Sequence, residues 1–174
     1  MQGIISILDE ANREIYQQLL RDLMRDLGVR LAYEPLAHFS YHVSAAYDTE
    51  QLLPLLEQTT WQMEPFVVQV SGLGIFTGAE PVIYATIVRS RQLAKLQEAL
   101  WDLADRCCPA PHELYHPDNW VPHITLLNGA ELPFRMPYVM EWLNERNFYH
   151  QVLVNNISFS PENADPVVFS FGQI

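Results

Sequence analysis

The chain has 174 residues, of which 49% are hydrophobic and 18% charged, a balance that is typical of a globular domain and excludes a disordered chain. Its 21 acidic residues outnumber 10 basic ones, so the formal net charge is −11 and an extended nucleic-acid interface is not expected. No apolar run reaches the roughly 18 residues of a membrane span, and the first residues lack the basic start of a signal peptide. The two cysteines, Cys107 and Cys108, are adjacent, which favours reduced thiols in a cytoplasmic protein. The length of the chain predicts one domain over residues 1–174.

The first half of the chain predicts strands near residues 4–8, 36–46 and 66–70, separated by two helices. The first helix spans about 10–27 and ends at Gly28. Its apolar spacing predicts a core-facing side made of Ile15, Leu19, Leu23 and Leu27, widened by Tyr16, Leu20 and Met24. Asp48 caps the second helix, which Pro54 shortens or kinks. The glycine-rich stretch 71–78 matches no phosphate-loop spacing, so it predicts a tight hairpin.

The second half repeats this order. A strand over 81–89 precedes a helix capped by Ser90, and a proline-rich loop over 108–117 leads to a strand around His123. Pro137 opens the last helix, and strands near 151–159 and 167–171 close the chain. The order is β-α-β-α-β twice, plus one strand. We therefore expect an α/β (α+β) fold of two lobes, roughly residues 1–78 and 79–174, related by a pseudo-two-fold axis about a central cleft.

One pattern occurs at matching places in the two halves. Ala37-His38-Phe39-Ser40-Tyr41 and Pro122-His123-Ile124-Thr125-Leu126 both read small residue, histidine, bulky apolar residue, hydroxyl, bulky apolar residue. Side chains two apart on a strand point the same way, so each histidine shares a face with a hydroxyl. An imidazole can move a proton near neutral pH, and a hydroxyl can hold an anionic oxygen.

A third match, His42-Val43-Ser44, overlaps the first. On a regular strand His38, Ser40, His42 and Ser44 would all lie on one face, so His42 is an alternative to His38 or a further residue of the site. His38 matches the second motif better, because a bulky residue follows its hydroxyl as in that motif, whereas Ala45 follows Ser44.

Paired H-x-[ST] motifs, one in each half of a duplicated fold, resemble those of the 2H phosphoesterases, which include the 2'-5' RNA ligase-like proteins and cyclic phosphodiesterases. The stretches 39–41, 72–78 and 115–126 resemble bacterial members of that family, although Ala37 replaces the usual proline and Ser40 the commoner threonine. The resemblance implies catalytic pairs His38 with Ser40 and His123 with Thr125, and no metal or other cofactor. His42, Tyr115 and His116 are candidate substrate-binding residues.

The chemistry of the residues agrees with that resemblance. Opening a 2',3'-cyclic phosphate needs one group to take a proton from water and another to protonate the leaving ribose oxygen, and two histidines supply both. The two hydroxyls would bond the non-bridging oxygens. The expected partner is a small cyclic-phosphate nucleotide or an RNA terminus, and the reverse reaction would make a 2'-5' linkage.

Two alternatives have a different basis. His112-Glu113-Leu114-Tyr115-His116 is a literal H-E-x-x-H, the signature of a zinc peptidase when both histidines lie one turn apart on a helix. Pro117 and the prolines before His112 disfavour that helix. A non-enzymatic nucleotide-binding domain on the same fold is the other alternative.

Overall fold

The computed structural model describes residues 1–29, 36–129 and 132–172, and within them the chain forms four α-helices, one short 3-10 helix and eight strands. The helices are α1 (Glu10–Leu27), α2 (Thr49–Trp61), α3 (Arg91–Asp105), η1 (Glu113–Tyr115, the 3-10 helix) and α4 (Leu132–Asn144). The strands are β1 (Gln2–Ile7), β2 (His38–Ser44), β3 (Phe66–Phe76), β4 (Val82–Ile87), β5 (His123–Asn128), β6 (Tyr149–Val154), β7 (Asn156–Ser160) and β8 (Val167–Ser170).

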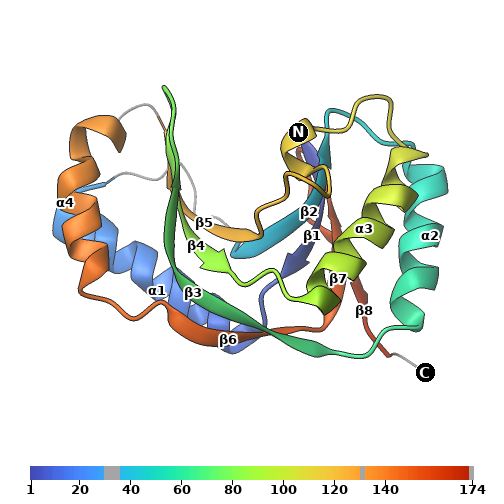
Figure 1. Cartoon of the computed structure of the whole chain (residues 1–174), viewed down its shortest axis with the longest axis horizontal. Coiled ribbons are helices and arrows are strands. Elements are labelled where there is room, and N and C mark those ends of the chain that lie inside the picture. The colour runs from blue at the N-terminus through green and yellow to red at the C-terminus, as the bar shows by residue number, and fades with distance from the viewer. Residues whose placement is uncertain (30–35, 130–131, 173–174) are drawn as a thin grey trace.

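The strands form two antiparallel sheets, in the orders β2-β1-β7-β8 and β5-β4-β3-β6. Figure 1 shows α1 and α4 together at the side of the second sheet, and α2 and α3 together at the far side of the first. The α/β class, with two lobes, is as the sequence predicts. The lobes do not follow the expected boundary near residue 78, however, because each sheet contains strands from both halves of the chain.

Helix starts and stops follow the local signals in the sequence. The side chains of Asp48 and Ser90 accept hydrogen bonds from the first-turn amides of α2 and α3, and Gly28 ends α1 in the left-handed conformation with φ 62°. One proline was misjudged, since Pro137 lies inside α4 instead of opening it. Pro54 lies inside the 13-residue α2. A proline removes one bond of the helical ladder, and here the helices continue past it.

Two strand predictions need correction. The hairpin expected over 71–78 is present but turns later, because β3 continues through Gly72 and Gly74 to Phe76 and connects over residues 77–81 to the antiparallel β4. Gly72 has φ 106° where the pairing of β3 with β4 shifts register, which identifies a β-bulge. The strand expected over 151–159 is two strands, β6 and β7, which belong to different sheets.

The core lies between each sheet and its helices. On β4 the side chains of Ile83, Ala85 and Ile87 face the core and are at most 2% exposed. On α1 the buried apolar positions are Tyr16, Leu20 and Leu23, whereas Ile15 and Met24, both expected on the core-facing side, are 57% and 38% exposed. Among the residues described, no helix has the length and apolar character needed to cross a membrane.

Candidate active site

The two motif strands, β2 and β5, are end strands of their sheets, and they contact each other where the lobes meet. His38 and Ser40 lie on β2 with the buried Phe39 between them, and His123 and Thr125 lie on β5 with the buried Ile124 between them. Each histidine therefore shares a strand face with its hydroxyl residue.

Each motif strand then carries a bulge immediately after its hydroxyl residue. Against β1, Ser40 pairs with Ile5 but His42 pairs with the adjacent Ile4, so Tyr41 is an extra residue. Against β4, Thr125 and Leu127 likewise pair with adjacent residues, so Leu126 is extra. A bulge of this kind reverses which residues face the core in the rest of the strand.

The bulge on β2 turns His42 away from the motif face. His42 is 0% exposed, and Tyr41 beside it is also 0% exposed. The expectation that His38, Ser40, His42 and Ser44 share one face is therefore wrong: His42 and Ser44 point into the interior. A substrate on the His38 face has no access to the His42 ring.

The two motif histidines are held in the same way. The Nδ1 atom of His38 lies 2.7 Å from the Leu36 carbonyl oxygen, and that of His123 lies 2.7 Å from the Val121 carbonyl oxygen. Because a carbonyl oxygen only accepts hydrogen bonds, each Nδ1–H is the donor. In the neutral imidazole Nε2 is then unprotonated and can accept a proton.

Burial lowers the pKa of both imidazoles, and the carbonyl hydrogen bonds of Leu36 and Val121 oppose this effect in part. His38 lies close enough to His123 for its charge to lower the pKa of His123 further. Both imidazoles are thus biased toward the neutral form, and the two titrate as neighbours.

The segment 115–120, which precedes β5, is held against β2 by hydrogen bonds. The Trp120 indole Nε1 donates to the Ser40 carbonyl oxygen at 2.8 Å, and the Gln97 amide donates to the Tyr115 carbonyl oxygen at 2.8 Å. Burial raises the pKa of Tyr115, and the nearby Ser40 side chain opposes this effect in part. Tyr115 therefore lies close to the motif face. His116 packs its ring 5.2 Å from that of Trp101 instead.

A cavity of about 450 Å³ opens beside this arrangement. His123, Thr125 and Tyr115 line it, together with Glu80, whereas His38, Ser40, His42 and His116 do not line it. No lysine or arginine is among its described lining residues. The volume is within the range of ligand pockets, about 300–1,000 Å³.

Two aromatic residues beside His123 escaped the sequence analysis. The rings of Phe76 and Tyr84 lie 4.9 Å and 5.1 Å from the imidazole, measured between centroids. The glycine-rich stretch 71–78 was the available signal, since it contains both Phe76 and Gly74, the glycine that pairs with Tyr84.

The H-E-x-x-H segment does not have the geometry of a zinc peptidase. Glu113–Tyr115 is a single 3-10 turn, with His112 before it and His116 after it, and not an α-helix with both histidines on one side. His112 uses Nδ1 to accept a hydrogen bond from the Leu114 amide at 3.3 Å. Within the described parts of the chain, no three His, Cys, Asp or Glu side chains are grouped to hold a metal ion.

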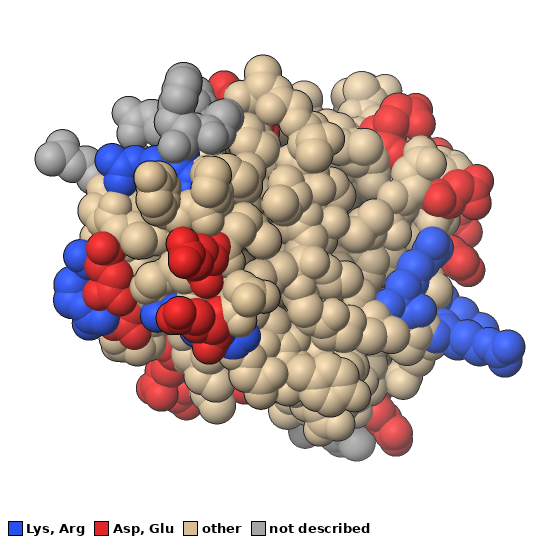
Figure 2. Space-filling model, turned by 60° about the vertical axis from the view of Figure 1, so that its left-hand side comes forward, with Lys and Arg blue, Asp and Glu red and all other residues tan. Residues whose placement is uncertain are grey.

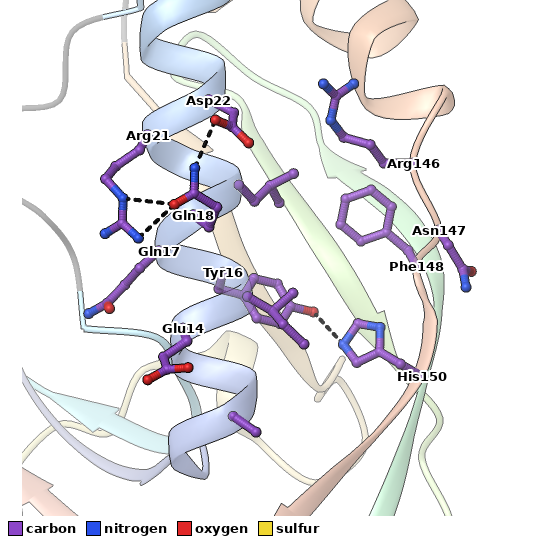
Figure 3. Close-up of a pocket in the computed structure, with 13 residues that line it drawn as sticks. Glu14, Tyr16, Gln17, Gln18, Arg21, Asp22, Arg146, Asn147, Phe148 and His150 are labelled. Atoms are coloured by element: carbon purple, nitrogen blue, oxygen red, sulfur yellow. Dashed lines mark hydrogen bonds between the residues drawn. The ribbon is translucent and has the colours of Figure 1, made fainter.

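A larger groove, about 1010 Å³, lies between α1 and β6, and none of the candidate catalytic or substrate-binding residues lines it. In Figure 3 the Tyr16 hydroxyl points across the groove to His150 Nε2, which lies 3.3 Å away, and Arg146 and Phe148 lie on the side opposite α1.

Figure 2 shows the charge on one face of the molecule. Basic side chains form separate patches there, with acidic side chains among them, and a broad area carries no charged side chain.

The family follows from a match over most of the chain. A model of the 2'-5' RNA ligase superfamily matches residues 9–165. The chain belongs to the 2'-5' RNA ligase superfamily, within the 2H phosphoesterases. This confirms the resemblance seen in the motifs and supports an enzyme of the phosphoesterase and RNA ligase kind.

Solved structures of this fold extend over the same length. TT0787 of Thermus thermophilus is 16% identical with a TM-score of 0.64, covering 98% of this chain and 97% of that one. E. coli LigT complexed with NADP+ is 18% identical with a TM-score of 0.59, covering 99% and 98%. Kluyveromyces marxianus Usb1 with uridine monophosphate is 9% identical with a TM-score of 0.53, covering 98% of both chains. No curated protein shows significant similarity to this chain.

Proposed function

We propose that this 2H phosphoesterase hydrolyses 2',3'-cyclic or related cyclic phosphates of nucleotides or RNA ends, without a metal, by acid–base catalysis between His38 and His123. The matched environment of the two imidazoles carries the proposal. Each precedes a hydroxyl residue and a bulge, and each donates Nδ1 to a carbonyl two residues earlier. Two Nε2 atoms prepared in the same way are what a reaction with one proton acceptor and one proton donor needs.

In the proposed hydrolysis a water oxygen bonds to phosphorus while one ribose oxygen leaves it. One neutral imidazole takes the water proton, and the other, protonated, gives a proton to the leaving oxygen, so the charges balance. The hydroxyls of Ser40 and Thr125 donate to the non-bridging oxygens, where negative charge builds up. If the 5'-hydroxyl of a nucleic acid takes the place of water and bonds to phosphorus while the 3' oxygen leaves, the same ring opening makes a 2'-5' linkage.

The lowered pKa values fit this division of roles. An imidazole whose pKa lies below its ordinary value is neutral at pH 7 and ready to act as the base. The anionic phosphate would favour the protonated form of its partner, because an opposite charge nearby stabilises that form. We expect kcat/KM to be bell-shaped in pH, with limbs that belong to the coupled pair.

The ligand class rests on size and charge. A cavity of about 450 Å³ suits a nucleotide better than a folded RNA. The net charge of −11 disfavours a long polyanion. The solved relatives are described with uridine monophosphate, ATP and NADP+, which are all small nucleotides. A nucleoside cyclic phosphate or the last nucleotide of an RNA meets these conditions.

The test is turnover of 2',3'-cyclic nucleotides, ADP-ribose cyclic phosphate and RNA ending in a cyclic phosphate by purified protein, with chelator present. His38→Ala and His123→Ala should each lower kcat/KM by about 10²–10⁴. The double variant should lose much less than the product of the single losses, because the two act in one step. Ser40→Ala and Thr125→Ala should cost less than either histidine.

Two results would contradict the proposal. The first is wild-type kcat/KM in both histidine variants. The second is tight nucleotide binding with no turnover of any substrate in the panel, which would assign the non-enzymatic alternative. Loss of activity on chelation, restored by zinc, would contradict the metal-independent mechanism specifically.

A further inference from the structure

Gly74 and Tyr84 fit together across β3 and β4. The two residues are direct partners in the antiparallel register. A Cβ atom placed on Gly74 would lie 2.3–2.5 Å from three atoms of the Tyr84 side chain, including its hydroxyl oxygen. The Tyr84 ring therefore lies directly over the Gly74 backbone, in space that any other residue at position 74 would occupy.

The ring so placed continues into an aromatic cluster that ends on His123. Tyr84 lies 4.3 Å from Phe76 and 5.1 Å from His123 between ring centroids, and Phe76 meets His123 edge-on at 4.9 Å and 85°. Tyr84 is 8% exposed. The imidazole is thus in contact with two aromatic rings. No such ring contact involves His38 among the residues the structure describes.

The cluster is separate from the hydrophobic core. Tyr84 pairs with Thr125, and Thr86 pairs with His123, so Tyr84 lies on the same face of the sheet as the β5 motif. The core face of β4 carries Ile83 and Ala85, which are both 0% exposed. A tyrosine on the motif face, supported by a mid-strand glycine, is not needed to fill the core.

We propose that Tyr84, supported by Gly74, is a positioning residue that fixes the orientation of the His123 imidazole through ring contact. The Nδ1 bond to the Val121 carbonyl holds one edge of the imidazole, and the two aromatic rings limit its tilt. Nε2 is then aimed in one direction before substrate arrives, which is the condition for efficient proton transfer. The inference rests on the proposed catalytic role of His123.

The same contact has an electrostatic consequence. Burial is the largest cause of the lowered pKa of His123, and the Tyr84 ring is one of the groups that bury the imidazole. Removing the ring exposes the imidazole to water, so the pKa of His123 should rise toward its ordinary value. His38 has its own environment and serves as the internal reference in the same sample.

The experiment compares Tyr84→Ala, Tyr84→Phe and Gly74→Ala. It measures kcat and KM on a 2',3'-cyclic nucleotide, and NMR titration of the His123 and His38 imidazoles. Tyr84→Phe keeps the ring and should stay within about threefold of wild type. Tyr84→Ala should lower kcat by about 10- to 100-fold with a smaller change in KM, and raise the pKa of His123 alone. Gly74→Ala should reproduce the kcat loss by displacing the ring.

Coupling between the two positions gives a further check. In the Tyr84→Ala background, Gly74→Ala should add no further loss, because nothing remains for the new Cβ to displace. An unchanged kcat and an unchanged His123 titration in Tyr84→Ala would overturn the inference, as would equal shifts at both histidines. A large loss in Tyr84→Phe would overturn it in favour of direct substrate contact by the hydroxyl.

The outcomes separate this inference from the proposed function. If wild-type protein turns over no cyclic phosphate, the proposed function fails, and the NMR titration still reports whether Tyr84 orders His123. If Tyr84→Ala does not fold, Gly74→Ala and Tyr84→Leu provide the same comparison, with thermal unfolding measured for each variant.

Discussion

His42 should make the protein lose stability as the pH falls below about 6.5. Its ring is fully buried, with Nδ1 2.5 Å from the Tyr47 hydroxyl oxygen, Nε2 4.0 Å from the Cys108 sulfur, and the Trp101 ring 4.8 Å away. Burial lowers the pKa of His42 to about 4, although the negative charge of Asp105 opposes the shift.

The sign and size follow from proton linkage. The folded pKa of about 4 lies below the ordinary value of 6.5, so on acidification the unfolded chain takes up the proton first. The stabilising contribution of His42 is fully present above about pH 6.5 and is lost as the pH falls toward 4. The loss should reach about 2 kcal/mol at pH 5 and about 3 kcal/mol below pH 4.

The variant His42→Leu isolates this effect. Leu127 occupies the position after the equivalent bulge on β5 and is buried there, so a leucine suits such a site. At pH 7.5 the variant should be about 1 kcal/mol less stable, through the lost hydrogen bond with Tyr47. At pH 5 it should be about 1 kcal/mol more stable than wild type, because it has no imidazole to protonate.

Urea unfolding of both proteins at several pH values between 5 and 7.5 measures the difference in their free energies of unfolding. The contributions of the other titrating groups are common to both proteins and cancel in that difference. His42→Gln is the matched control, since it keeps a polar side chain without the titration and should flatten the curve similarly. Parallel stability curves for wild type and both variants would refute the reasoning. Activity should survive in His42→Leu, because the ring lies away from the motif face.

Three other outcomes are expected. Tyr41→Phe removes a buried hydrogen bond of 2.8 Å to the Ser6 hydroxyl and should lower the free energy of unfolding by about 1 kcal/mol in urea titration, whereas no change would mean that the bond contributes nothing net. Gly28→Ala should cost about 1 kcal/mol by the same measurement, because φ at this helix end is 62°, and a gain in stability would contradict that account. Glu113→Gln, assayed without chelator, should leave phosphodiesterase activity unchanged, and loss of activity would reopen the metal hypothesis.

The sequence predicted well those features that depend on neighbours along the chain. Capping by Asp48 and Ser90, and the end of α1 at Gly28, are set by side-chain and backbone chemistry within a few residues. The alternation in the two motifs is also local, which is why both histidine–hydroxyl pairs could be placed on strands.

The bulges could not be predicted in the same way, because an extra residue in one strand is defined by the register of its partner. On β5 there was a trace in the sequence, since two consecutive apolar residues, Leu126 and Leu127, break the alternation. On β2 the same trace was hidden, because the residue after Tyr41 is a histidine. A polar residue in an inward-facing position was therefore assigned to the motif face.

Sheet membership was the other failure, and it has a similar cause. The segment 151–159 is apolar enough to predict one strand, and only the three-dimensional arrangement shows that β6 joins β3 while β7 joins β1. Local sequence encodes a strand and its inward face, but the partner strand is chosen by contacts far along the chain.

The exchange of strands between the halves has a consequence for the site. The sheet that carries His38 is completed by β7 and β8 from the end of the chain, and the sheet that carries His123 contains β3 from the first half. Neither motif strand therefore belongs to a lobe that its own half of the chain could complete alone. Contacts that hold β3 against β4, such as the fit of Tyr84 over Gly74, connect the first half directly to His123. The relative placement of the two imidazoles therefore depends on strands from both halves of the chain.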